Sequence, residues 1–374
     1  MTDLALSEAA LSLIPDREWS RHPITTAPPG PPHYSVLDHG YVKVIRSWGS
    51  DEEIIETARM STDKGFLGWE PGACPVCNGS GWTGDAPRGD LEMQRCHACE
   101  GRGVIPGDAK LLRHLYEHRH STPFEFGGLT LEVQAPLMVF REWHRHRTQS
   151  YSEMSARYVQ MPDLHYVPSV ERIIASARKQ RNKQASGGGA LHIPDSSIPP
   201  LVPPEVIGMF RRQVQSEEDT ARFIQQLIRG EQKRVYDLYE QLLSFGVAKE
   251  IARIDTPVSR YSRMRATTDL RNWLAFLTLR MDPNAQFEIR QYAWCVADAI
   301  AVHFPRTYEL FLEGMTPTLE PELAPKKLLS DSLEALSWAS GATDFNEGGI
   351  AAEGWRNIAA PLITRLCRSL GRSV

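Results

Sequence analysis

Apolar and polar residues alternate or recur at helical spacing along much of the chain, which predicts both strands and amphipathic helices. Residues 41–45 indicate a strand, and Leu129, Leu131 and Val133 alternate with polar residues as in a half-buried strand. Ser50 precedes three acidic residues, which is typical of a helix N-cap and first turn. These patterns together predict a mixed α/β fold.

Further helices are expected where apolar residues recur every three or four positions. Asp108 begins one such pattern, and Pro136 is placed to open another at its first turn, a position that proline tolerates. Longer helical patterns lie near residues 205–246, 267–281 and 285–303, with two short amphipathic segments at 328–338 and 358–370.

Three stretches interrupt this periodicity. One is rich in Pro, one in Gly, Pro and Cys, and one in Gly, Ser and Pro, and all are too irregular for helices or central strands. The organisation that we expect is an N-terminal arm at 1–34, a main domain at 35–316, an insertion at 66–107 within it, a flexible excursion at 181–205, and a helical C-terminal extension at 317–374.

Composition narrows the class of protein. The chain has 374 residues, 41% of them hydrophobic, and its 42 basic against 46 acidic side chains give a net charge of −4. This balance is typical of a globular protein, and the slight negative charge is not expected of a protein that coats nucleic acid. No apolar run approaches the roughly 20 residues that span a bilayer, and the N-terminus lacks a secretion-signal pattern. Six cysteines, four of them in CxxC pairs, do not make a disulfide framework, so we expect a cytoplasmic protein.

The insertion contains two CxxC pairs, Cys74 with Cys77 and Cys96 with Cys99. Four thiolates at this spacing suit one tetrahedral Zn²⁺ ion. Each pair continues as CxxCxGxG, and the glycines allow backbone N–H groups to point at sulfur. This repeat resembles the zinc-binding region of DnaJ-type chaperones. His97 is an alternative ligand, but four cysteines are the simpler set.

Two roles for such a zinc site are open. One hypothesis is a metal staple for an insertion too small to hold its own core, and the other is a docking surface for protein or nucleic acid. Catalytic zinc is not expected, because four cysteines leave no open coordination position. Cys295 and Cys367 are interpreted as buried thiols outside the site.

The densest polar stretch is residues 141–158, where arginines and histidines create local positive charge in an acidic protein. Arginine side chains bind phosphate bidentately, and serine hydroxyls and turn N–H groups complete such a site. A solvated basic helix face is the alternative. The interleaved Trp143, Tyr151 and Tyr158 favour a stretch that largely faces protein or a ligand.

Within this stretch, residues 145–147 read RHR and are followed after seven residues by Ser155, the RHR-x7-S signature of the flavin-dependent thymidylate synthases. The chain resembles that family in further segments that keep the family's order. They are 37–42, 57–61, 120–125, 155–158, 250–253 and 279–292. The resemblance runs from about residue 35 to 315 and is interrupted by the insertion and the excursion.

The resemblance implies a homotetramer of mixed α/β subunits whose active sites combine residues from several chains. Such enzymes bind FAD, reduce it with NADPH, and transfer a one-carbon unit from methylenetetrahydrofolate to C5 of dUMP. The residues that would hold FAD by motif position are His120, Thr122, Arg145, His146, Arg147 and Asp269. Those that would hold the nucleotide are Glu142, Glu153, Ser155, Arg157, Arg253 and Arg280, of which Arg280, Ser155 and Glu153 are expected to serve the reaction itself.

The residue types suit these roles. Ser155 and Arg157 are two positions apart in an expected turn or strand, so both can face one phosphate. Arg280 beside a pyrimidine carbonyl can stabilise negative charge that develops on the ring. A nucleophilic Ser155 is an alternative that would need an adjacent base. For Glu153 the alternative is a capping or salt-bridge carboxylate.

Several positions depart from the family's usual residues. Glu142 replaces a Gln that touches the nucleotide, and Asp269 and Ala275 replace asparagines near the flavin; the others are Phe126 and Ser152. A Glu is unfavourable near a phosphate, but it accepts a hydrogen bond from an exocyclic amine such as cytosine N4. The alternatives to dUMP methylation are therefore methylation or hydroxymethylation of another pyrimidine nucleotide such as dCMP, and a zinc-ribbon binding protein on a non-catalytic flavin fold.

Overall fold

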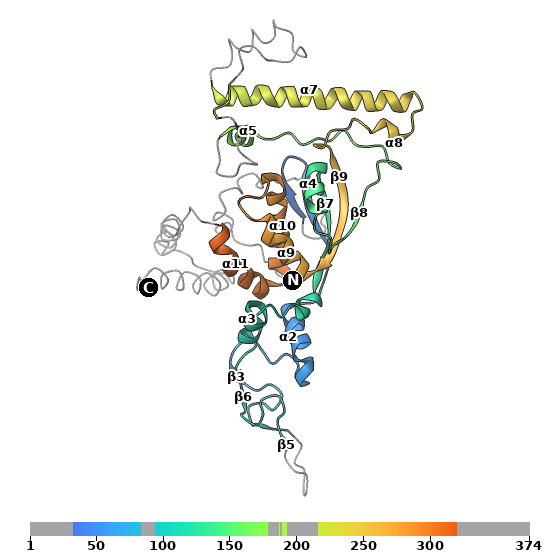
Figure 1. The fold of residues 1–374 in the computed structure, drawn as a ribbon. Helices are drawn as coiled ribbons and strands as arrows, with labels where there is room; N and C mark the ends of the chain where they lie inside the picture. Colours follow the sequence, from blue (N-terminus) through green and yellow to red (C-terminus); the bar gives the residue numbers. More distant parts are fainter. Residues whose placement is uncertain (1–32, 84–93, 179–186, 188, 193–215, 320–374) are drawn as a thin grey trace, which may run out of the picture. The chain divides into compact units, whose positions relative to one another are not determined.

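The computed structural model describes residues 33–83, 94–178, 187, 189–192 and 216–319 (Figure 1). The expected N-terminal arm lies outside these residues, as do most of the excursion and nearly all of the C-terminal extension, which includes Cys367. Among the helices that are described, none is both long and apolar enough to cross a membrane.

A five-stranded antiparallel sheet forms the centre of the described structure (Figure 1). Its strands are β1 (His33–Val36), β2 (Gly40–Trp48), β7 (Gly128–Pro136), β8 (Ser150–Glu153) and β9 (Tyr261–Asp269), in the order β1-β2-β7-β9-β8. The register places Leu131 of β7 between Val44 and Ala266, and all three side chains are buried. The strand expected from the alternation around Leu131 is therefore confirmed.

Helices cover one face of this sheet. The α-helices are α2 (Asp51–Arg59), α3 (Ala109–Glu117), α4 (Leu137–Trp143), α5 (Val170–Ala177), α7 (Glu217–Ser244), α8 (Lys249–Ala252), α9 (Leu270–Arg280), α10 (Phe287–His303) and α11 (Pro305–Leu319), with 3-10 helices η2 (Met60–Thr62) and η3 (Thr122–Glu125). Helices α4, α9 and α10 pack against the sheet (Figure 1). Between them lies the main core, where the Trp143 ring contacts those of Trp273, Phe276 and Tyr292. This arrangement confirms the mixed α/β fold class.

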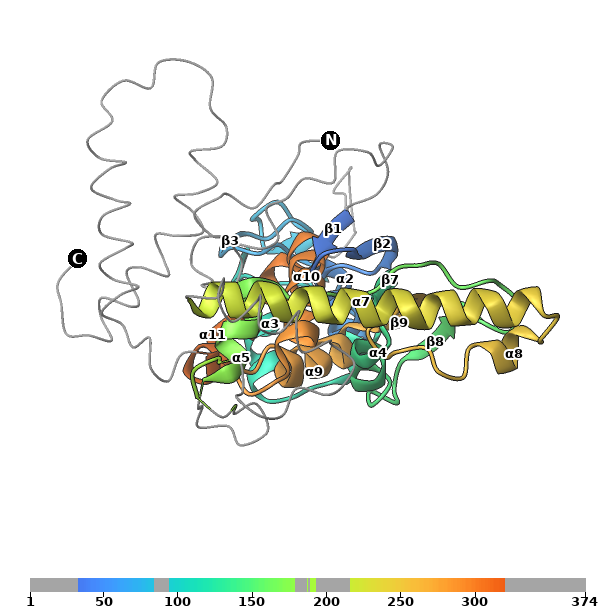
Figure 2. The same cartoon turned by 90° about the horizontal axis from the view of Figure 1, so that it is seen from above.

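A second, smaller core lies under the long helix α7, which runs beside α5 (Figure 2). Tyr236 donates a hydrogen bond to the carbonyl of Met161 at 3.1 Å, and the Tyr239 hydroxyl accepts one from the Met161 N–H at 3.1 Å. Gln232 donates to the carbonyl of Tyr166 at 2.9 Å. These bonds fix the segment that follows β8 against α7.

Two expectations from the sequence are wrong in detail. The helix expected over 267–281 begins at Leu270, because residues 261–269 pair with β7 and β8 as a strand. Pro136 ends β7 and is the N-cap of α4 rather than a residue of its first turn. In contrast, Ser50 caps α2 as expected, since its hydroxyl accepts a hydrogen bond from the Glu53 N–H at 3.2 Å.

The cysteine-rich insertion consists of short paired strands. β3 (Gly72–Ala73) pairs with β6 (Val104–Ile105), and β4 (Trp82–Thr83) pairs with β5 (Gln94–Arg95). Two-residue strands bury little apolar surface, and the buried cluster of the described insertion consists mainly of the four cysteines with Leu67, Ala98 and Ile105. Such a unit needs an additional constraint to be stable.

Candidate functional site

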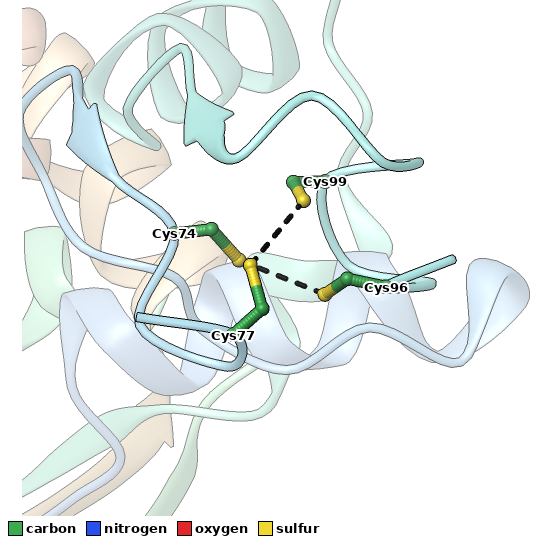
Figure 3. Close-up of side chains that lie close together, drawn as sticks. All are labelled: Cys74, Cys77, Cys96 and Cys99. Atoms are coloured by element: carbon green, nitrogen blue, oxygen red, sulfur yellow. Dashed lines mark hydrogen bonds between the residues drawn. The ribbon is translucent and has the colours of Figure 1, made fainter. Parts of the chain in front are cut away.

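The four cysteines of the insertion meet at one point. Figure 3 shows their side chains converging, and all four sulfur atoms lie within 4.8 Å of one another. All four side chains are buried. His97 is exposed and is not a member of the cluster, which supports the simpler four-cysteine set. The group can bind a metal ion, and its four sulfur donors match tetrahedral zinc.

The glycines of the two CxxCxGxG repeats have the role that their spacing predicts. The Gly81 N–H donates to Cys77 Sγ at 3.2 Å, and the Gly103 N–H donates to Cys99 Sγ at 3.3 Å. Both glycines have positive φ angles, of 80° and 72°, which other residues rarely adopt. These donors orient the sulfurs and stabilise thiolate charge, as expected around a metal site.

One buried carboxylate joins the base of the insertion to the main domain. Asp108 is fully buried, forms an ion pair with Arg59 at the end of α2, and accepts a hydrogen bond from the Leu67 N–H at 2.8 Å. Lys64 and Glu100 form a second, more exposed ion pair at 2.8 Å. The insertion is therefore tied to the helix that precedes it.

The arginine at the end of α9 lies against the RHR segment that follows α4. Arg280 Nη1 donates to a Glu142 carboxylate oxygen at 2.6 Å, and Nη2 donates to the Glu142 carbonyl at 2.8 Å. Its Nε donates to His146 Nε2 at 2.9 Å. The side chain of Arg280 is 15% exposed, whereas that of Glu142 is 41% exposed. Three residues predicted from the sequence thus form one cluster, although they come from segments far apart in the chain.

The imidazole of His146 is held neutral in this cluster. Burial lowers its pKa to about 4, and the charge of Arg280 acts in the same direction, while the charge of Glu142 opposes it. A neutral ring is consistent with Nε2 as the acceptor from Arg280. The Phe276 ring packs 4.8 Å from the imidazole, and Tyr151 donates to the His146 carbonyl at 2.7 Å. These contacts fix both the ring and the backbone of the RHR segment.

A second group of predicted residues lies at β8 and in the turn after it. Glu153 accepts a hydrogen bond from the Ser262 hydroxyl at 2.7 Å. Ser155 Oγ accepts from the Arg157 N–H at 3.3 Å, and Arg157 Nε donates to Glu250 at 2.9 Å. Ser155 and Arg157 are therefore in a turn, one of the two conformations expected from the sequence.

Helix α8 contributes the last nucleotide-binding candidate. It carries Glu250 and ends at Arg253, its C-cap, so the Arg157–Glu250 contact brings Arg253 to the same region. Glu250 lies in a segment that resembles the family, but the sequence indicates no role for Glu250 or Ser262. Nothing in the local pattern marks either residue as a partner of this turn.

A third group surrounds a shallow pocket at the 3-10 helix η3. The pocket has a volume of about 170 Å³ and is lined by Ala58, Leu115, His120, Ser121, Thr122 and Pro123. His120 and Thr122, two of the predicted flavin-binding residues, therefore share it. Arg145 and Arg147 are exposed, so their guanidinium groups are available to a ligand. Asp269 instead caps α9, and its carboxylate accepts from the Asn272 N–H at 2.8 Å and the Asn272 side-chain amide at 2.7 Å.

Comparison with known proteins decides the family. The family model described as "Thymidylate synthase complementing protein" matches residues 43–306. The chain is 31% identical over 286 residues to the flavin-dependent thymidylate synthase of Thermus thermophilus, covering 76% of this chain and 80% of that protein. The chain belongs to the flavin-dependent thymidylate synthase family. A member from Wolbachia pipientis wMel is 30% identical, with 75% and 76% of the two chains covered.

Solved structures extend the likeness to a methylase of the same fold. The chain is similar to the UMP/dUMP methylase PolB from Streptomyces cacaoi bound with 5-Br dUMP, with a TM-score of 0.51 and 25% identity. The match covers 75% of this chain and 97% of that one. The resemblance predicted from the RHR segment is thus confirmed for the family, and with it the class of enzyme, a methyltransferase.

Proposed function

We propose that this flavin-dependent thymidylate synthase family member transfers a one-carbon unit from methylenetetrahydrofolate to C5 of dUMP and gives dTMP, with FAD as cofactor and NADPH as reductant. The observation that carries the proposal is the contact of Arg280 with His146 and Glu142, because it joins two motifs of the family in one polar cluster. The similarity to a UMP/dUMP methylase supports a uracil nucleotide as substrate.

The residues present suit FAD. His120 and Thr122 line a pocket, and the exposed Arg145 and Arg147 offer the guanidinium forks that match a pyrophosphate. The pocket, at about 170 Å³, is smaller than the roughly 300–1,000 Å³ typical of sites for whole ligands. A site completed by neighbouring subunits fits this size, and we propose the homotetramer that the family resemblance implies.

Bound reduced FAD would supply the reducing equivalents for the transfer. The protein's own contribution is position and charge. Ser155 and Arg157 would hold the nucleotide phosphate, with Arg157 exchanging the exposed Glu250 carboxylate for phosphate oxygens. Arg280 would stabilise negative charge on the pyrimidine ring, because its guanidinium has five N–H donors and its three hydrogen bonds to His146 and Glu142 leave two. Ser155 is in contact with a backbone N–H rather than a base, which favours phosphate binding over nucleophilic attack.

A second candidate reaction concerns another pyrimidine nucleotide. The Glu142 carboxylate adjoins Arg280, so a base that is held by Arg280 would also meet an anionic acceptor. An exocyclic amine such as cytosine N4 donates to such an acceptor, whereas the uracil O4 carbonyl cannot. This contact keeps methylation or hydroxymethylation of dCMP as the alternative.

The zinc-binding insertion is proposed to be a structural staple. Its described residues bury little beyond the cysteines, and a bound Zn²⁺ ion would supply the missing constraint. None of the five described cysteines forms a disulfide, which fits the reducing, cytoplasmic setting that we propose.

Product mass spectrometry tests the proposed function. Purified protein with FAD, NADPH and methylenetetrahydrofolate is given dUMP, UMP and dCMP together, and the nucleotides are weighed. We expect a methyl group on dUMP. A methyl or hydroxymethyl group on dCMP alone would replace the proposal with the alternative, and a purified protein without flavin would favour a binding protein.

A further inference from the structure

Arg260, just before β9, is a buried arginine without a matching carboxylate. Arg260 is 5% exposed, and its Nε atom has no hydrogen-bond partner among the described residues. The guanidinium makes one hydrogen bond to a described residue, from Nη1 to the Tyr261 carbonyl at a long 3.4 Å. It forms no ion pair with any carboxylate in the described part of the chain.

Backbone hydrogen bonds hold the main chain around Arg260 in place. The Arg260 N–H donates to the Pro257 carbonyl at 3.1 Å, and its own carbonyl accepts from the Leu137 N–H at 3.0 Å. The flanking Tyr261 N–H donates to the Leu164 carbonyl at 2.9 Å. His165 forms an isolated bridge opposite Arg260. The main chain at Arg260 is thus held between the 159–167 segment and the start of α4.

Strand geometry places Arg260 beside the nucleotide-binding candidates. Side chains two positions apart in extended chain share a face, so Arg260 and Ser262 point the same way, and Ser262 donates to Glu153 at 2.7 Å. Burial lowers the pKa of Arg260, the charge of Glu153 opposes that effect, and the charge of Arg253 adds to it. Arg260 therefore lies within electrostatic range of two residues expected to bind the nucleotide.

A buried guanidinium without an ion pair is costly, because its hydration is lost and little replaces it. Glu153 already accepts from Ser262 and lies too far from Arg260 to form an ion pair with it. Burial lowers the pKa of neighbouring His165, which favours its neutral form, and its ring lies 3.4 Å from the Asp163 carboxylate. The carboxylates of Glu153 and Asp163 thus lie in this region, but neither is within ion-pair distance of the Arg260 guanidinium.

We infer that Arg260 is a further substrate-binding residue, which together with Arg253 binds the phosphate of the nucleotide. The inference rests on the proposed function for the identity of the anion. A phosphate oxygen satisfies the Arg260 donors and supplies the missing negative charge, which a neutral pyrimidine ring does not. Arg260 would then add an arginine to the set predicted from motifs alone.

The test uses the full-length, FAD-loaded protein and the substitution Arg260→Met, which removes the charge and keeps an apolar stem. Without nucleotide, we expect the melting temperature to equal or exceed that of the wild type, because an unpaired buried charge is removed. The Kd for dUMP, measured by calorimetry, should rise about tenfold or more, since a charge-assisted hydrogen bond is lost. Inorganic phosphate should raise the melting temperature of the wild type and not that of the variant.

Two further variants separate a binding role from a structural one. Arg260→Lys keeps the positive charge but loses the bidentate geometry of the guanidinium. Its Kd for dUMP should therefore lie between those of the wild type and of Arg260→Met. Arg234→Met removes one exposed arginine from α7 and should leave the Kd unchanged. A fall in the melting temperature of Arg260→Met with an unaltered Kd for dUMP would overturn the inference, as would a wild type that neither dUMP nor phosphate stabilises. A wild type that binds dUMP but forms no dTMP contradicts the proposed function alone.

Discussion

The carboxylate of Glu142 lies 2.6 Å from Nη1 of Arg280 and neutralises the guanidinium that is expected to face the pyrimidine ring. The resemblance to the family implies a neutral glutamine at this position instead. Here the ring would meet an ion pair rather than a lone cation, which weakens the stabilisation of negative charge on uracil and adds an acceptor for an amine. The departure from the family therefore acts on Arg280 as much as on the substrate.

Replacing Glu142 by Gln is expected to change selectivity and not stability. The Glu142 side chain is 41% exposed, so loss of the ion pair should change the free energy of unfolding by at most about 1 kcal/mol. The ratio of kcat/KM for uracil over cytosine nucleotides should rise about tenfold, because an anionic acceptor is lost. Competition assays with dUMP and dCMP measure the ratio. Glu231→Gln, which breaks an exposed pair on α7, is the control, and an unchanged ratio in Glu142→Gln would refute the specificity role.

The lowered pKa of His146 predicts how the stability of the fold depends on pH. Its pKa in the fold is about 4, below the roughly 6.5 of an unperturbed histidine, so the unfolded chain takes up the proton first as pH falls. The contribution of His146 to stability is complete above pH 6.5 and decreases from there towards pH 4. Urea unfolding at several pH values should show a slope in this window that is reduced in His146→Gln. Equal slopes in the two proteins would mean that His146 is not held neutral.

Zinc content and its consequences can be measured directly. We expect one zinc ion per chain, and Cys74→Ser should reduce this content and make the 66–107 insertion susceptible to proteolysis, because the metal replaces a core there. Cys295→Ala is the matched control, since Cys295 is buried in the main core outside the cluster and its replacement should leave zinc bound. If the Cys74→Ser insertion resisted proteolysis as the wild type does, the staple hypothesis would be wrong.

Substitutions of Asp269 can distinguish a role as a helix cap from a role in flavin binding. As the N-cap of α9, its carboxylate accepts from the Asn272 N–H at 2.8 Å. Asp269→Ala should lower the free energy of unfolding by about 1 kcal/mol, whereas Asp269→Asn, which keeps an acceptor, should have little effect. Denaturant unfolding measures these changes in stability, and the flavin Kd of both variants tests whether Asp269 binds flavin. A flavin Kd that changes in Asp269→Asn without a change in stability would show that the residue contacts flavin.

A local sequence pattern predicts a strand or a helix cap when a few neighbouring residues are enough to indicate it. The alternation in β7 and the Ser50 cap are visible in a few neighbouring residues, and both are confirmed. β9 was not predicted, because the alternation of Met264 and Ala266 with Arg263 and Arg265 is short and the last residues of the strand merge with the helical spacing that begins at Leu270. Only the pairing with β7 and β8 makes this segment a strand.

The same limit applies to the candidate site. Motifs identified individual residues such as His146 and Arg280, but not which of them touch. Glu250 bonds Arg157 across 93 positions of sequence, and Ser262 bonds Glu153 across 109. Contacts of this kind depend on the tertiary fold, and neither Glu250 nor Ser262 has a local signal that reveals its partner.

Asp108 provides the last prediction, because it connects the insertion to the flavin-binding candidates. Its buried carboxylate pairs with Arg59, and the preceding Ala58 lines the pocket with His120 and Thr122. Asp108→Asn would leave the largely buried Arg59 guanidinium without its anion, which typically costs about 3–5 kcal/mol. We expect a lower melting temperature and a higher Kd for FAD, measured by fluorescence titration.

The control for this prediction is the exposed ion pair of the same insertion. Glu100 is 63% exposed where it meets Lys64, so Glu100→Gln should change neither the melting temperature nor the Kd for FAD appreciably. Zinc content should remain at the wild-type value in both variants, since neither residue is a ligand. If Asp108→Asn lost zinc but bound FAD normally, Asp108 would hold only the insertion. A loss of FAD affinity with zinc retained would show that the pocket at η3 depends on the contact between Asp108 and Arg59.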